Sequence, residues 1–113
     1  MALTHAEPGD IIEVKPLGAA LVAAKSHALF KSADLEVIRL VPKSGERMPP
    51  HAVAGEFTLQ CLEGRIAFVC ASGERELATG QMTYLAGNEL HALRGIDDAS
   101  LLLTITLKNK PGA

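Results

Sequence analysis

Apolar and polar side chains alternate along several short runs of this chain, with the period of two that is typical of β-strands. The run 65–70 places Ile66, Phe68 and Cys70 on one face. In the run 34–41, Arg39 interrupts one face, so that Ile38 and Leu40 are expected on a second, partly covered face. The clearest alternation lies in the run 101–108, whose apolar face consists of Leu101, Leu103, Ile105 and Leu107.

Turn-forming residues separate these runs at intervals of about eight to twelve residues. They lie at 8–10, 16–18, 42–45, 63–64, 71–73, 79–80, 87–88 and 95–98. This spacing favours an all-β sandwich or barrel over alternating strands and helices. Only the alanine-rich stretch 17–30 could form a helix, and we interpret it as two short strands or one strand with an irregular end.

The chain has 113 residues, the size of one domain. We expect a single domain over residues 1–113, in which N-terminal strands over about 1–33 take part in dimerisation. A barrel core is expected over 34–107, and a frayed polar tail over 108–113.

Charge and composition exclude several classes of partner. Lys and Arg total 11 and Asp and Glu total 13, so the net charge of −2 gives no basic surface for nucleic acid or an anionic membrane. Aromatic residues make up 4%, which argues against a base-stacking surface. Cys61 and Cys70 have neither a disulfide framework nor metal-knuckle spacing. Because no secretory or membrane-spanning segment is visible, we expect a cytoplasmic protein.

Two histidines stand in motif-like surroundings. His51 follows the segment 45–50, which begins with glycine and ends in two prolines, and Gly64 closes a turn thirteen residues later. Gly80 begins a second segment, in which His91 follows a Gly87–Asn88 turn. Asparagine tolerates the left-handed backbone of such a turn better than other non-glycine residues.

This arrangement resembles the two motifs of the cupin superfamily in its small, single-domain form. The resemblance implies an all-β fold, a double-stranded β-helix or jelly-roll barrel. In that family the first motif supplies two histidines and a glutamate to a metal, and the second motif supplies a third histidine. Here Val53 and Phe57 stand at the second histidine position and the glutamate position, so that His51 and His91 are the retained ligands.

The resemblance makes His51 and His91 candidate ligands for a divalent Fe, Mn, Ni, Cu or Zn ion, all of which neutral imidazole binds. Glu56 and Gln60 are candidates for completing the site. On a regular strand both face away from the interior, whereas a β-bulge near residues 54–55 would turn Glu56 inward and give a site of two histidines and one carboxylate. Each histidine is also consistent with a hydrogen-bonded structural residue, so a domain without any metal is an open alternative.

Two functions are consistent with these residues. The first is binding of a small molecule inside the barrel beside the histidines, with or without a weakly held metal. The pocket is then expected to be lined by Val53, Phe57, Leu59 and Cys61. The alternative is a metal-dependent enzyme of the dioxygenase or isomerase type that uses His51, Glu56 and His91.

The expected partners are a small-molecule ligand and a second copy of the chain. A barrel of this size leaves open strand edges and apolar faces in water, and small cupins commonly cover them by pairing N-terminal strands across a homodimer. We expect neither nucleic acid nor a membrane as a partner.

Overall fold

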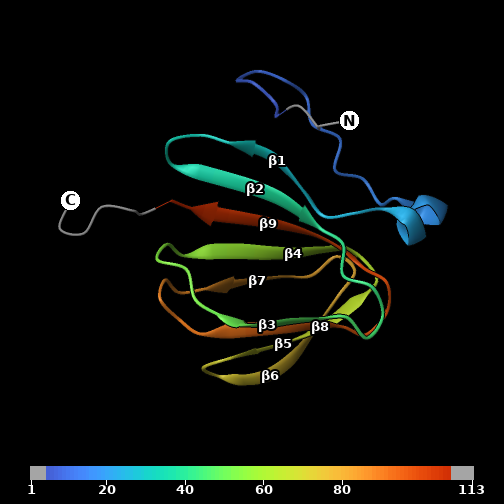
Figure 1. Cartoon of the computed structure of the whole chain (residues 1–113), viewed down its shortest axis with the longest axis vertical. Helices are drawn as coiled ribbons and strands as arrows, with labels where there is room; N and C mark the ends of the chain where they lie inside the picture. Colours follow the sequence, from blue (N-terminus) through green and yellow to red (C-terminus); the bar gives the residue numbers. More distant parts are fainter. Residues whose placement is uncertain (1–4, 108–113) are drawn as a thin grey trace.

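The computed structural model describes residues 5–107, and the tail expected over 108–113 lies outside the described residues. The described chain is built from β-strands and one short 3-10 helix, η1 (Gly18–Ala23) (Figure 1). The strands are β1 (His27–Lys31), β2 (Leu35–Leu40), β3 (Arg47–His51), β4 (Phe57–Glu63), β5 (Arg65–Cys70), β6 (Gly73–Ala78), β7 (Met82–Leu85), β8 (His91–Gly95) and β9 (Ser100–Thr106). No helix between residues 5 and 107 has the length and apolar character needed to cross a bilayer.

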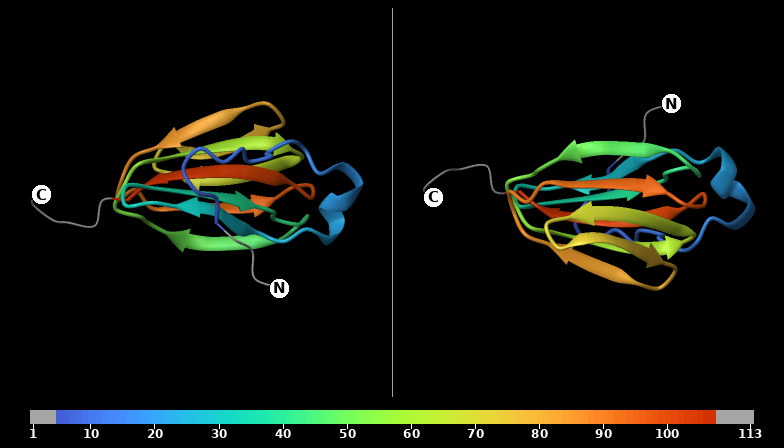
Figure 2. Two further views of the ribbon diagram at one scale, coloured as in Figure 1. Left: turned by 90° about the horizontal axis from the view of Figure 1, so that it is seen from above. Right: turned by 90° about the horizontal axis from the view of Figure 1, so that it is seen from below.

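These strands form two antiparallel sheets that face one another. One sheet has the order β1-β2-β9-β4-β7, and the other has the order β3-β8-β5-β6. Strands distant in sequence are neighbours in both sheets, as in a Greek-key jelly roll. Figures 1 and 2 show the two sheets stacked as layers, with the connections crossing between them at both ends. The predicted all-β jelly-roll fold is confirmed.

The hydrophobic core lies between the sheets and follows the predicted alternation in β5 and β9, whereas in β2 it is Leu40, expected on a second and partly covered face, that packs against it. Ile66 and Leu101 have no exposed surface, and Phe68 retains only 4% of its exposure. Burying side chains of this size stabilises the fold by about 1.5–3 kcal/mol each. The inward side chains that form the buried cluster are Leu59, Cys61, Ile66, Phe68, Leu77, Ala99 and Leu101.

Strand β2 is covered on both faces near its end, which explains the position of Arg39. Leu40 packs against the core cluster between the sheets. Arg39 points to the other side and is only 3% exposed. Its guanidinium Nη2 donates a hydrogen bond of 2.8 Å to the carbonyl oxygen of Lys15. The segment before β1 therefore covers the outer face of β2 at this point.

The stretch 17–30 contains the 3-10 helix η1 and the start of strand β1, where we expected two short strands or one strand with an irregular end. The carboxylate of Glu63 accepts hydrogen bonds from the backbone N–H groups of Leu17, at 2.6 Å, and Gly18, at 3.1 Å. These contacts hold the start of η1 at the end of β4, where Gly18 has a φ of 59°. The helical turn is thus fixed by a residue far along the chain, which local propensity could not indicate.

Candidate functional site

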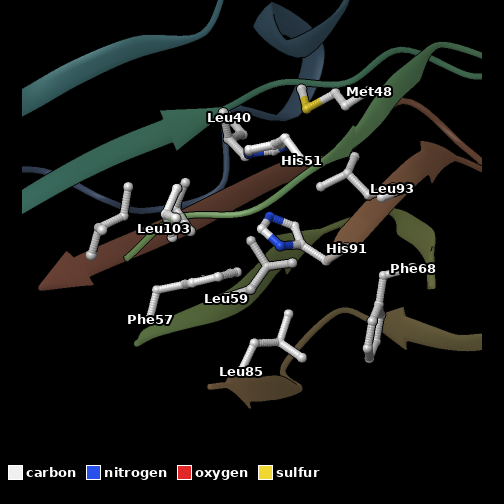
Figure 3. A pocket seen from close by; sticks show the side chains of 13 residues that line it. Leu40, Met48, His51, Phe57, Leu59, Phe68, Leu85, His91, Leu93 and Leu103 are labelled. Atoms are coloured by element: carbon white, nitrogen blue, oxygen red, sulfur yellow. The ribbon is translucent and has the colours of Figure 1, made fainter. Parts of the chain in front are cut away.

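A cavity of about 200 Å³ lies between the two sheets. Its walls consist of apolar side chains and two imidazole rings (Figure 3). An engineered apolar cavity of about 150 Å³ is large enough to hold benzene, so this space fits a molecule of about one ring. The lining residues are Leu40, Met48, His51, Val53, Phe57, Leu59, Phe68, Leu85, His91, Ala92, Leu93, Leu103 and Ile105.

The two sheets supply opposite walls of this cavity. In the five-stranded sheet, Phe57 of β4 pairs with Ile105 of β9, and Leu59 pairs with Leu103. Since residues paired directly across neighbouring strands point to the same face, these four side chains form a continuous apolar wall. His91 of β8 stands in the opposite sheet, so the cavity lies between an apolar wall and a strand that carries an imidazole.

A register shift in β3 brings His51 into this space. Met48 pairs with Leu93 and His51 pairs with His91, so the two residues between them on β3 lie opposite a single residue of β8. Such a bulge re-aims the side chains that follow it, and both Met48 and His51 line the cavity as a result. Pro49 and Pro50 lie within the shifted segment, on an edge strand that tolerates the loss of their N–H groups. The proline pair is the sequence signal for this bulge.

The two imidazoles meet at the cavity. Their ring centroids are 4.4 Å apart and the ring planes are tilted by 57°. His91 is 8% exposed, and its ring centroid lies 4.8 Å from that of Phe57. His51 is exposed and therefore lies at the rim. Figure 3 shows the rings of His51 and His91 approaching one another from their separate strands.

Each ring is oriented by a backbone carbonyl two residues earlier in the chain. Nδ1 of His91 lies 3.2 Å from the carbonyl oxygen of Glu89, and Nδ1 of His51 lies 3.3 Å from that of Pro49. A carbonyl oxygen only accepts hydrogen bonds, so Nδ1 must carry the proton and donate it in both contacts. In the neutral rings, Nε2 is then the free acceptor.

Glu56 and Gln60 lie away from the cavity. The side chain of Glu56 is exposed, and its carbonyl oxygen accepts hydrogen bonds from the backbone N–H of Thr106, at 3.1 Å, and from its hydroxyl, at 2.8 Å. Gln60 alternates with the inward Leu59 on β4 and does not line the cavity. The structure therefore brings His51 and His91 together without either of these two candidates.

Gly55 is explained by close packing of two backbones and not by the β-bulge considered near residues 54–55. Strand β4 pairs with β9 in unbroken register from Phe57 to Cys61. Gly55 is buried, and a Cβ atom there would collide with the carbonyl oxygen of Thr106. Glycine is needed at this position because the two backbones approach closely.

The four residues expected to line a pocket divide into two groups. Val53, Phe57 and Leu59 line the cavity, whereas Cys61 lies deeper in the core at 1% exposure. Its Sγ donates to the carbonyl oxygens of Glu63 and Gly64, at 3.4 and 3.3 Å, and burial raises the pKa of its thiol. The other lining residues were not predicted to belong to the pocket, and they are Leu40, Met48, Phe68, Leu85, Ala92, Leu93, Leu103 and Ile105.

The donor set does not fit a metal centre with three protein ligands. Among residues 5–107, no group of three or more His, Cys, Asp or Glu side chains is placed to hold a metal ion. Val53 and Phe57 line the same cavity as the histidines, and neither side chain can donate an electron pair to a metal. Typical catalytic zinc sites use three protein ligands, whereas this cavity offers two imidazoles.

Comparison with known proteins gives a match in structure but not in sequence. No family model matches the chain, and no curated protein matches it. A cupin superfamily protein from Desulfitobacterium hafniense superposes with a TM-score of 0.75 at 17% identity, over 91% of this chain and 100% of that one. The chain has the cupin fold.

Other solved structures agree with this cupin fold. A conserved protein of unknown function from Streptococcus pyogenes has a TM-score of 0.73 at 16% identity, over 97% of this chain and 100% of that one. Oxalate decarboxylase from Bacillus subtilis, which has Mn(II) centres, has a TM-score of 0.61 at 16% identity. The match spans 66% of this chain but 22% of the decarboxylase. The resemblance inferred from the spacing of the two motifs is thus confirmed for the fold.

Proposed function

We propose that this cupin-fold domain binds a small, largely apolar molecule in the cavity between its sheets. The observation that carries the proposal is a space of about 200 Å³ whose lining contains two imidazoles and otherwise only apolar side chains. Ligand sites are typically concave and mostly apolar, with a few polar groups that fix the orientation of the ligand. The histidine pair supplies those polar groups.

Burial of apolar surface supplies the driving force for this binding. Removing apolar surface from water contributes about 25 cal/mol per Å², and the cavity walls are already in place around the space. A ligand therefore gains this burial without a large ordering cost in the protein. The exposed position of His51 marks the side from which a molecule can enter.

A divalent ion held by His51 and His91 alone would be bound weakly, since water must fill its other coordination positions. The carboxylate that could compensate its charge is missing from the cavity, because Glu56, just before β4, is exposed and does not line the cavity. We therefore place recognition of an apolar molecule ahead of metal binding. Metal analysis of protein prepared without chelator or affinity tag measures how much divalent ion the two histidines retain.

Toluene titrated into the ¹⁵N-labelled protein tests cavity binding directly. We expect saturable shifts in amides of β4, β8 and β9, three of the strands that line the cavity. A Leu103→Phe variant fills the cavity from β9 and should lose these shifts. A Leu102→Phe variant is the matched control, because the neighbouring side chain points to the opposite face of the strand. Absence of saturable shifts in the wild type, or equal binding by both variants, would overturn the proposal.

A further inference from the structure

We infer that the cavity selects neutral molecules that carry a hydroxyl group on a one-ring apolar body, the phenol class, over carboxylates and ammonium ions of the same size. This inference rests on the proposed binding of small molecules in the cavity. It adds the chemical class of the ligand, which follows from the hydrogen-bonding state of the two imidazoles and from the charge of the walls around them.

The cavity presents hydrogen-bond acceptors. In both His51 and His91 the Nδ1–H group is engaged by a backbone carbonyl, at 3.3 and 3.2 Å. The nitrogen that remains in each neutral ring, Nε2, carries a lone pair and accepts. The ring centroids are 4.4 Å apart, so both rings border the same part of the cavity, and a ligand O–H can donate its one hydrogen to either Nε2. The matching ligand group is therefore a donor, such as O–H.

The cavity provides no compensation for a charged ligand. None of its thirteen described lining residues is Lys, Arg, Asp or Glu. Glu89 lies two residues before β8. Its carboxylate accepts a hydrogen bond of 2.8 Å from the backbone N–H of Ala71. Burying an unpaired charge is far more costly than burying a hydrogen-bonded neutral group. A carboxylate would also face two lone pairs, whereas an ammonium group would have no counter-ion.

The volume of the cavity also limits the size of the ligand's apolar part. About 200 Å³ holds one ring with few substituents. Phe57 and His91, with ring centroids 4.8 Å apart, offer aromatic surfaces to such a ring. Leu59 and Leu103 complete the wall opposite the histidines. An aromatic ring with its hydroxyl directed to the imidazoles satisfies the volume, the apolar walls and the acceptors together.

The experiment compares toluene, phenol and benzoate by NMR titration at about pH 8, where free imidazole is mostly neutral. A hydroxyl buried without a partner costs about 1–3 kcal/mol, which would make phenol about 5- to 150-fold weaker than toluene. With a partner, phenol binds at least as tightly as toluene, and this is the result expected for the wild type. Benzoate should bind at least tenfold more weakly than phenol, or not at all.

Histidine variants assign the effect to the two rings. In the double variant His51→Leu/His91→Leu, phenol should become about tenfold or more weaker than toluene, while toluene binding persists and reports an intact cavity. The single variant His51→Leu alters only the exposed ring and serves as a second test if the double variant does not fold. His27→Leu is the matched control. His27 makes the same kind of Nδ1 contact, 3.0 Å to the carbonyl oxygen of Lys25, but does not line the cavity.

The outcomes separate the two proposals. If toluene does not bind the wild type, cavity binding fails and the ligand class fails with it. If toluene binds but phenol is about fivefold weaker or more, or benzoate matches phenol, the cavity stands as a binding site and the inferred class is overturned. If phenol keeps its affinity relative to toluene in the His51→Leu/His91→Leu variant, the histidines do not select the ligand and the inference is equally refuted.

Discussion

Truncating Leu59 to alanine tests whether the packing around the cavity has been correctly assigned. Leu59 is 2% exposed, belongs to the buried cluster and also lines the cavity. The substitution removes three buried carbons, and the lost burial of these carbons lowers the free energy of unfolding by about 2.4 kcal/mol. The vacated space joins an existing cavity of about 200 Å³, so the walls cannot collapse to refill it. We therefore expect a loss of about 4 kcal/mol, in the upper half of the range for buried leucines.

Urea unfolding followed by circular dichroism measures this loss. With an m-value of about 2 kcal/mol/M, the midpoint should fall by about 2 M while m itself is unchanged. Leu102→Ala is the matched control on the outer face of the same sheet, where the side chain is half-buried, and should cost about 1 kcal/mol. A Leu59→Ala variant no less stable than Leu102→Ala would show that the inward face of β4 has been assigned wrongly.

Three further predictions concern metal binding, the cysteines and assembly. Val53→His adds a third imidazole to a cavity that already contains His51 and His91. Isothermal titration calorimetry with Ni²⁺ or Co²⁺ should show at least tenfold tighter binding than in the wild type. Equal affinity would contradict the position of residue 53 in the cavity wall. Burial raises the pKa of the Cys61 thiol, so the folded protein favours the protonated thiol. The contribution of this thiol to the stability of the fold is therefore present below about pH 9 and is lost as the pH rises through the raised pKa. Native protein at about pH 8 should accordingly be labelled by a thiol reagent at the half-buried Cys70 long before Cys61, and equal rates would contradict this. Light scattering should report a homodimer, whereas a monomer at micromolar concentration would reject the expected assembly.

The fold was predictable because its signals are local. Alternation over 101–107 identifies β9 and its inward face, and glycines at turn positions divide the chain into short strands. The 3-10 helix was not predictable in this way. Its start is held by Glu63, 46 positions along the chain from Leu17, and such a contact leaves no periodic trace near the helix.

The candidate site was predictable only in part, for a related reason. The spacing of the two motifs identifies His51 and His91, and alternation within one strand identifies Phe57 and Leu59 as inward residues. Met48 was missed because its orientation depends on the bulge opposite β8. The leucines that β2, β7 and β9 contribute become neighbours only through the order of strands in the sheets, and this order follows from pairing between distant segments.

Phe57 stands at the glutamate position of the first cupin motif. It removes a possible metal ligand, and it also changes the surroundings of His91. A carboxylate at this position would place a negative charge beside the imidazole and favour a cation between the two histidines. Phenylalanine instead places an apolar ring with its centroid 4.8 Å from that of His91 and leaves the nitrogens of the histidine pair as the polar atoms of an uncharged wall. A lone pair in such surroundings is best satisfied by a neutral donor, since a charge of either sign would be desolvated without a partner. Beside a carboxylate, the same two histidines could form part of a metal site. Beside Phe57 and the other apolar side chains of this cavity, they favour a hydroxyl group.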